Sequence, residues 1–166
     1  MSEKIAVSMK INGKEVSLLS APEQNLLRLL RENGYVEVKC GCEEGDCGTC
    51  TVLLDGLSVK SCVTPACACE GREVWTAAGV SRQERIGRLL RDNFAKYGAS
   101  QCGFCTPGMM VTGVNYLMNN GMPDRQAIRA AISGNLCRCT GYKKIIDAIY
   151  HTAQELRRET AGEEML

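Results

Sequence analysis

The sequence predicts an α+β protein, in which a small mixed β-sheet with one main helix is followed by a group of helices. Three observations lead to this prediction. Apolar residues alternate along residues 4–20, which is typical of strands. Beyond residue 80 they recur at helical spacing instead. Eleven cysteines are spread over both parts and gather in two regions. We therefore expect two domains, residues 1–78 and residues 79–166.

The N-terminal elements are marked by turn and capping residues. Asn12-Gly13 interrupts the alternation over residues 4–20, which predicts two strands joined by a tight turn. Leucines between Asn25 and Asn33 predict the main helix, and Gly34 is placed to end it. The other expected elements are a strand at 51–54, a turn at Asp55-Gly56, a returning strand at 58–60, a short helix over about 63–70 and a last strand at 73–75.

The C-terminal half is expected to contain four helices, each bounded by a glycine, a proline or a capping residue. They are predicted from Ser81 to Gly98, from Thr106 to Gly121, from Asp124 to Gly134, and after Thr140-Gly141. One cysteine pair precedes the second helix and another precedes the fourth, so both pairs lie close to free backbone N–H groups. Four thiolates brought together between two helix hairpins would bind one metal centre.

Composition argues against several classes of protein. The net charge is +1 and aromatic residues make up 5% of the 166 residues, so nothing favours nucleic-acid binding. No stretch approaches the roughly 18 apolar residues of a membrane helix, and the N-terminus lacks the features of a secretory signal. We expect a soluble, cytoplasmic protein that binds neither nucleic acid nor a membrane. In a reducing cytosol, eleven cysteines are more typical of metal binding than of disulfides.

The first cysteine constellation has the spacing of an iron–sulfur site. It consists of Cys42, Cys47, Cys50 and Cys62. A C-x4-C-x2-C run with a distant fourth cysteine is the plant-type ferredoxin spacing for a [2Fe–2S] cluster. Gly41, Gly45 and Gly48 would permit the backbone conformations that a loop wrapped around a cluster needs. A structural zinc site also uses four cysteines, but it favours two short-spaced pairs, so the cluster is the stronger interpretation.

The second constellation is less specific. It consists of Cys102, Cys105, Cys137 and Cys139. Spacing alone leaves a zinc site and a second cluster open, and a redox-active C-x-x-C pair is a weaker alternative because no βαβ pattern surrounds it. The remaining cysteines, Cys40, Cys67 and Cys69, are expected to be buried or half-buried residues without a metal role.

Three segments of the chain resemble the signatures of the xanthine oxidase family of molybdenum hydroxylases. They are Gly41–Val52, Gln101–Met109 and Gly134–Tyr142. The similarity extends over roughly residues 4–155, and it is to the small iron–sulfur subunit of multi-subunit members. Bacterial xanthine, carbon monoxide, nicotinate and aldehyde dehydrogenases are examples of such enzymes.

The resemblance implies a fold and two cofactor sites. The N-terminal domain would be a β-grasp, plant-type ferredoxin-like domain that binds one [2Fe–2S] cluster through the first four cysteines. The C-terminal domain would be a four-helix bundle that binds the other cluster through the second four. Gln101 and Cys139 match family positions that hydrogen-bond the pterin, so Cys139 would be both a cluster ligand and an electron contact.

The resemblance also implies a function within a larger assembly. The chain would relay electrons from the molybdopterin cofactor of a large subunit, through its two clusters, to the FAD of a medium subunit or to another acceptor. It would carry no substrate site, and the whole enzyme would be a dimer of heterotrimers. The alternative is a free-standing two-cluster carrier similar to a ferredoxin.

One residue departs from the family pattern beside the first cluster site. Glu43 stands where the family usually has glycine after the first cysteine. An ionised carboxylate at this position would lower the reduction potential of the N-terminal cluster. A Glu43→Gly variant with an unchanged potential would contradict this hypothesis.

Overall fold

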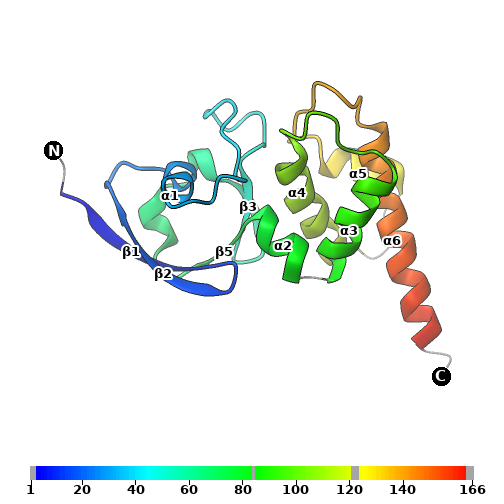
Figure 1. The fold of residues 1–166 in the computed structure, drawn as a ribbon, viewed down its shortest axis with the longest axis horizontal. Helices are drawn as coiled ribbons and strands as arrows, with labels where there is room; N and C mark the ends of the chain where they lie inside the picture. The colour runs from blue at the N-terminus through cyan, green and yellow to red at the C-terminus, as the bar shows by residue number, and fades with distance from the viewer. Residues whose placement is uncertain (1–2, 84, 121–123, 164–166) are drawn as a thin grey trace.

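The computed structural model describes residues 3–83, 85–120 and 124–163. In these ranges the chain forms two lobes that lie side by side, an N-terminal lobe built on a sheet and a C-terminal lobe built of helices (Figure 1). The α+β architecture predicted from the sequence is therefore confirmed.

The N-terminal lobe contains a five-stranded mixed sheet. Its strands are β1 (Ile5–Ile11), β2 (Lys14–Ser20), β3 (Thr51–Leu54), β4 (Leu57–Lys60) and β5 (Glu73–Trp75). They are arranged in the order β2-β1-β5-β3-β4, so the last strand in the sequence lies at the centre. Strand β5 runs parallel to β1 and antiparallel to β3. The predicted Asn12-Gly13 turn joins β1 to β2, with positive φ angles of 51° and 81°.

Helix α1 (Leu26–Glu32) packs against this sheet and completes the β-grasp arrangement. Its four leucines are fully buried, and Asn25 caps it by accepting a hydrogen bond from the Arg28 N–H at 2.9 Å. The helix expected over 63–70 is instead two short 3-10 helices, η1 (Ser61–Val63) and η2 (Ala66–Cys69). They are separated because Pro65 favours an extended conformation at the residue before it, which is Thr64.

The C-terminal lobe contains five helices among the described residues. They are α2 (Ala77–Gln83), α3 (Arg85–Lys96), α4 (Thr106–Asn119), α5 (Arg125–Ala131) and α6 (Lys143–Glu163). The single helix expected from Ser81 is instead two helices, α2 and α3, and the first of them begins at Ala77. Asp124 caps α5 as predicted, but α5 ends at Ala131, before Gly134. Gly121, expected to end α4, lies outside the described residues.

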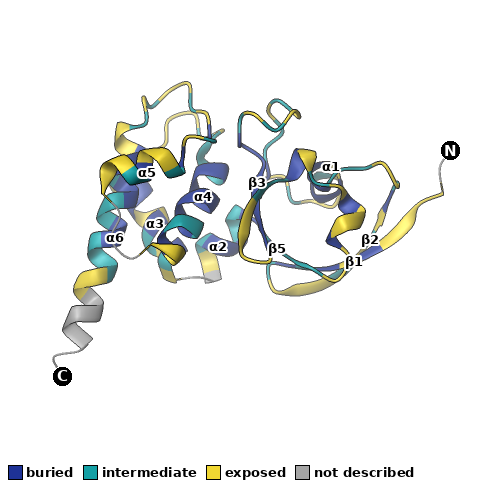
Figure 2. Cartoon of the chain, turned by 180° about the vertical axis from the view of Figure 1, so that it is seen from behind, coloured by how far each residue is buried: buried dark blue, intermediate teal, exposed yellow. Residues whose placement is uncertain are grey.

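Each lobe has its own apolar core. Helix α4 is the most buried element of the helical lobe and faces the sheet, whereas the edge strand β2 and its neighbour β1 expose many side chains (Figure 2). Leu53 of β3 belongs to the core of the helical lobe, so the sheet and the helices are packed directly against each other. Among the residues that the structure describes, no helix combines the length and the apolar character needed to cross a membrane.

Candidate functional site

The loop before β3 and the two loops that precede α4 and α6 lie next to one another along one side of the molecule (Figure 1). Seven of the eight cysteines in the two constellations lie on these loops, and Cys62 lies in η1. The structure therefore places the two predicted sets of cysteines on neighbouring segments of the chain.

The N-terminal cysteines fall into two pairs by their influence on one another's ionisation. Among the cysteines, Cys47 has the largest effect on the pKa of Cys42, and Cys50 has the largest effect on the pKa of Cys62. Of the three loop glycines, Gly45 and Gly48 have positive φ angles of 86° and 67°, as the sequence predicted. Gly41 has a different role, because a Cβ atom there would lie 2.7 Å from the Cys47 Sγ.

Backbone groups prepare this loop to hold a thiolate. The N–H groups of Cys47 and Glu44 both donate to the Cys42 Sγ at 3.4 Å, and they lower the pKa of the Cys42 thiol to about 6. Cys62 is buried. Its burial is the main cause that raises its pKa to about 11, and the nearby Cys50 thiol is the second cause. Burial disfavours a free thiolate at Cys62, so a bound metal would have to displace its proton.

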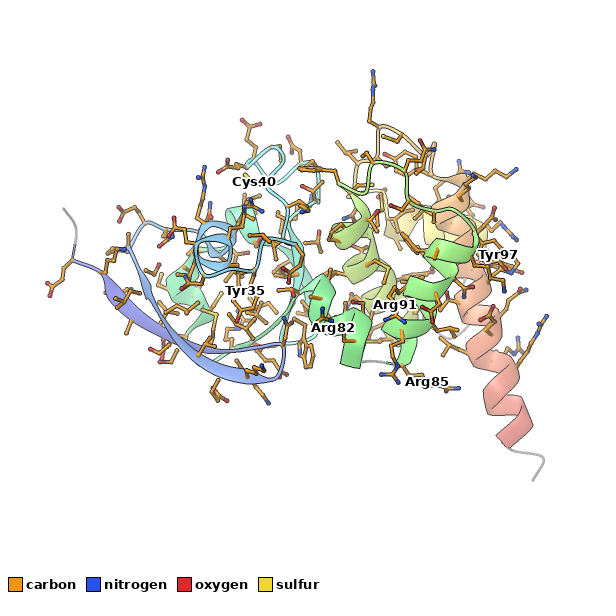
Figure 3. The ribbon with its side chains drawn as sticks, viewed as in Figure 1. Tyr35, Cys40, Arg82, Arg85, Arg91 and Tyr97 are labelled. Carbon is orange, nitrogen blue, oxygen red and sulfur yellow. The ribbon has the colours of Figure 1, made fainter. Side chains whose placement is uncertain are left out.

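Glu43 forms a charged contact next to the Cys42 loop. Its carboxylate accepts a bidentate pair of hydrogen bonds from Arg28 of α1, with a shortest distance of 2.6 Å, and another from the Cys40 Sγ at 3.0 Å. Glu43 has a positive φ of 62°, a conformation that favours glycine. Cys40 lies on the same loop, above α1 (Figure 3). The negative charge proposed from the sequence is present, but a neighbouring positive charge accompanies it.

The C-terminal cysteines also fall into two pairs. The Sγ atoms of Cys102 and Cys139 are 3.6 Å apart, and among the cysteines Cys137 has the largest effect on the pKa of Cys105. Burial and the Cys137 thiol raise the pKa of Cys105 to about 12. Burial alone would raise the pKa of Cys137 as well, but hydrogen bonds from the Thr140 hydroxyl and N–H hold it below its ordinary value.

Both sets of cysteines fit a [2Fe–2S] cluster. Four cysteines bind such a cluster, two on each iron, so the ligands are expected in two close pairs. Four thiolates around a single zinc ion, at a Zn–S distance of about 2.3 Å, would instead all be equally close to one another. Among the cysteines, the largest influence on the pKa of Cys62, Cys105 and Cys139 comes in each case from one partner: Cys50, Cys137 and Cys102, respectively. The donor set and its pairing therefore match the cluster.

The two sites differ in their exposure to solvent. Cys102 and Cys139 are exposed, and so is Gln101, which precedes Cys102. In the N-terminal site Cys50 and Cys62 are buried, whereas Cys42 and Cys47 are intermediate. One prediction for the remaining cysteines was wrong: Cys67 is exposed rather than buried, while Cys40 is half-buried and Cys69 is buried.

Sequence reasoning missed a buried asparagine that joins the two cysteine loops. The side chain of Asn135 is 4% exposed, donates to the Gly48 carbonyl at 2.8 Å and accepts from the Thr112 hydroxyl at 2.9 Å. An asparagine in a loop next to a glycine has the sequence signature of an ordinary turn residue. Its burial against a residue that is 87 positions away could be found only in the folded chain.

Two family models match consecutive parts of the chain. Residues 9–76 match a 2Fe-2S iron-sulfur cluster binding domain, and residues 76–150 match a [2Fe-2S] binding domain. The nicotinate dehydrogenase small FeS subunit of Eubacterium barkeri is 41% identical over 152 residues, which covers 91% of this chain and 96% of that subunit. The xanthine dehydrogenase iron-sulfur-binding subunit of Escherichia coli O157:H7 is 40% identical over 150 residues and covers 89% of this chain and 94% of that subunit.

Solved structures show the same arrangement. A chain of quinoline 2-oxidoreductase from Pseudomonas putida 86 superposes with a TM-score of 0.87 at 43% identity, covering 95% of this chain and 98% of that one. The aldehyde oxidoreductase from Desulfovibrio gigas superposes with a TM-score of 0.85 at 36% identity, covering 93% of this chain and 17% of the longer protein. The chain therefore belongs to the small [2Fe–2S] iron–sulfur subunits of the xanthine dehydrogenase family, which transfer electrons within multi-subunit molybdenum hydroxylases.

Proposed function

We propose that each group of four cysteines holds one cluster, and that each iron is bound by one of the close pairs described above. The N-terminal irons would be bound by Cys42 with Cys47 and by Cys50 with Cys62; the C-terminal irons would be bound by Cys102 with Cys139 and by Cys105 with Cys137. The direct contact between the Cys102 and Cys139 sulfurs, 3.6 Å apart, is the observation that carries this assignment, and the electrostatic pairing of the other cysteines agrees with it. When bound, each [2Fe–2S] cluster accepts or donates one electron at a time.

Residues of this chain have distinct tasks toward these groups. The N–H groups of Cys47 and Glu44 stabilise negative charge at the Cys42 sulfur, and Thr140 does the same at Cys137. The buried Cys62 and the half-buried Cys105 limit the access of water to the inner side of each site. These differences in hydrogen bonding and burial are the means by which a protein sets cluster potentials.

We further propose a direction for the electron relay. Gln101 and the exposed Cys102 and Cys139 would face the molybdopterin cofactor of a large subunit, and the N-terminal site would deliver electrons to FAD in a medium subunit or to another acceptor. Exposure of these three residues supports this orientation, because an electron contact to another subunit has to lie at the surface.

The complete enzyme would be a cytoplasmic dimer of heterotrimers, and this chain would divide near residue 78 into its two cluster domains. The separate apolar cores support that division.

Metal and sulfide analysis of anaerobically purified protein tests the assignment. We expect about four irons and four acid-labile sulfides per chain, and two distinct S = 1/2 EPR signals after dithionite reduction. Cys47→Ser should remove one signal and spare the other, whereas Cys67→Ser, at an exposed cysteine outside both sites, should leave both. Zinc without sulfide, or loss of both signals in Cys47→Ser alone, would overturn the assignment.

A further inference from the structure

The two cysteine loops are joined by a direct backbone hydrogen bond. The Leu136 N–H donates to the Cys47 carbonyl oxygen at a distance of 2.9 Å. Leu136 immediately precedes Cys137, and Cys47 itself carries one of the sulfurs of the N-terminal site. The hydrogen bond therefore links a residue that would bind one cluster to the neighbour of a residue that would bind the other.

Asn135 holds this contact in place. Its side chain bridges the lobes, because the amide donates to the Gly48 carbonyl at 2.8 Å while its oxygen accepts from Thr112 of α4 at 2.9 Å. Gly48 follows Cys47, and Asn135 precedes Leu136, so the two interlobe hydrogen bonds lie side by side on adjacent residues. Two anchored bonds of this kind fix the separation and the register of the loops more tightly than either one would alone.

The backbones at this point approach as closely as two chains can. A Cβ atom added to Gly48 would collide with the Gly134 carbonyl oxygen and would lie 2.8 Å from the Asn135 amide nitrogen. A second contact between the loops is looser: a Cβ atom at Gly41 would be 3.8 Å from the ring of Phe104, whose residue is 46% exposed. The Phe104 contact contains no hydrogen bond in the described structure, so it offers only a through-space connection.

We propose that the Leu136 N–H···O=C Cys47 hydrogen bond is the electron-transfer contact between the two cluster sites, and that Asn135 is the residue that positions it. The inference rests on the assignment of the cysteines made under the proposed function. An electron passes between sites more readily along covalent and hydrogen bonds than across a gap between side chains. In each event one site is oxidised by one electron and the other is reduced by one, and no bond is formed or broken.

The primary test uses the full chain with both clusters assembled and reduced. Two S = 1/2 centres interact by dipolar coupling through space, which depends on their separation, and by exchange coupling, which depends on the bonded path. Asn135→Ala should abolish the exchange splitting of the low-temperature EPR spectrum and leave the dipolar broadening. Asn115→Ala is the matched control, because Asn115 also bridges the lobes by donating to a glycine carbonyl, that of Gly56, at 2.5 Å but away from the cysteines. This control should retain the splitting.

A backbone substitution tests the hydrogen bond itself. Replacing the Leu136 peptide nitrogen by an ester oxygen, through incorporation of the corresponding α-hydroxy acid, removes the donor and keeps every side chain. We expect the exchange splitting to be lost and electron transfer between the clusters after rapid photoreduction to be slower. An ester chain with an unchanged splitting and rate would overturn the proposal. Phe104→Leu should have no effect on the splitting, and its loss in that variant would assign the contact to the aromatic ring instead.

The outcomes separate this proposal from the assignment of the clusters. If iron analysis or the two EPR signals fail in the unmodified chain, then the assignment fails before any variant is compared. If both signals are intact and the splitting does not respond to the Leu136 ester, then only the proposed contact is wrong. If Asn135→Ala loses a cluster, the ester chain decides the question, since it leaves the Asn135 anchor unchanged.

Discussion

The junction between the lobes should be unusually sensitive to a single added methyl group at Gly48. In Gly48→Ala the new Cβ would collide with the Gly134 carbonyl oxygen and would lie 3.0 Å from the Asn135 Cα, both of which are backbone atoms that cannot rotate away. The alanine would also be held at a φ of 67°, in the left-handed region. We therefore expect the two cysteine loops to be forced apart and the Asn135–Gly48 hydrogen bond to be broken.

The magnitude follows from three separate contributions. Left-handed backbone costs an alanine about 1–2 kcal/mol, overpacking a tight site costs about 1–3 kcal/mol, and a lost hydrogen bond costs about 0.5–1.5 kcal/mol. Gly71→Ala is the control for the backbone contribution alone, because Gly71 has nearly the same φ, 69°, and a Cβ atom added there would meet nothing within 4 Å. Gly48→Ala should therefore be less stable than Gly71→Ala by about 2–4 kcal/mol, which in a protein of this size is roughly 5–15 °C in Tm.

Circular dichroism and visible absorption during heating at one fixed rate measure this difference. The first signal follows the helices and the sheet, and the second follows the clusters. We expect Gly48→Ala to lose its visible absorption at a lower temperature than Gly71→Ala, and to lose it before its helices melt. Equal transition temperatures in the two variants would refute the reasoning, because backbone strain alone would then account for both.

Three further predictions concern neighbouring residues. Redox titration of the N-terminal cluster should give a lower potential for Arg28→Met and a higher potential for Glu43→Gln. The double variant should have a potential near the original, because the two charges compensate each other. Shifts of the same sign in both single variants would contradict this. Gly108→Ala should lower the Tm, although glycine-to-alanine changes inside helices usually stabilise by about 1 kcal/mol, because the added Cβ would collide with the Gly48 carbonyl. Thr112→Val should cost about 1–3 kcal/mol in thermal unfolding, since it leaves the buried Asn135 oxygen without its donor, and an unchanged Tm would exclude that role.

The parts of the fold that the sequence predicts are those with strong local causes. The β1–β2 hairpin depends on Asn12-Gly13, and α1 depends on its leucines and on the Asn25 cap, all of which are read from adjacent residues. The start of α2 at Ala77 was missed because Ala77–Gln83 has no amphipathic repeat. Gly79 of α2 instead lies against Asn12 and Trp75, and such contacts become visible only after the sheet has formed.

The candidate site shows the same division. Spacing alone predicted four cysteines for each site, since ligand types and their separation are local properties of the sequence. Spacing did not predict that Arg28 would face Glu43 from α1, so the sequence suggested a bare negative charge where the structure has an ion pair. It also gave no sign of Asn135, because a buried and a solvated asparagine are identical in sequence.

The central position of β5 has a consequence for how the chain is made. Because synthesis proceeds from the N-terminus, β1–β2 and β3–β4 emerge as separate hairpins, and no strand of the sheet pairs with both until β5 has been added. Isolated hairpins are marginally stable in water, so all four N-terminal cysteines are synthesised while the loop around them is still open. We expect this interval to be the time when iron and sulfide enter the first site. The strand that then completes the sheet continues almost directly into α2, so the residues that close the sheet are adjacent in the chain to the first helix of the second lobe.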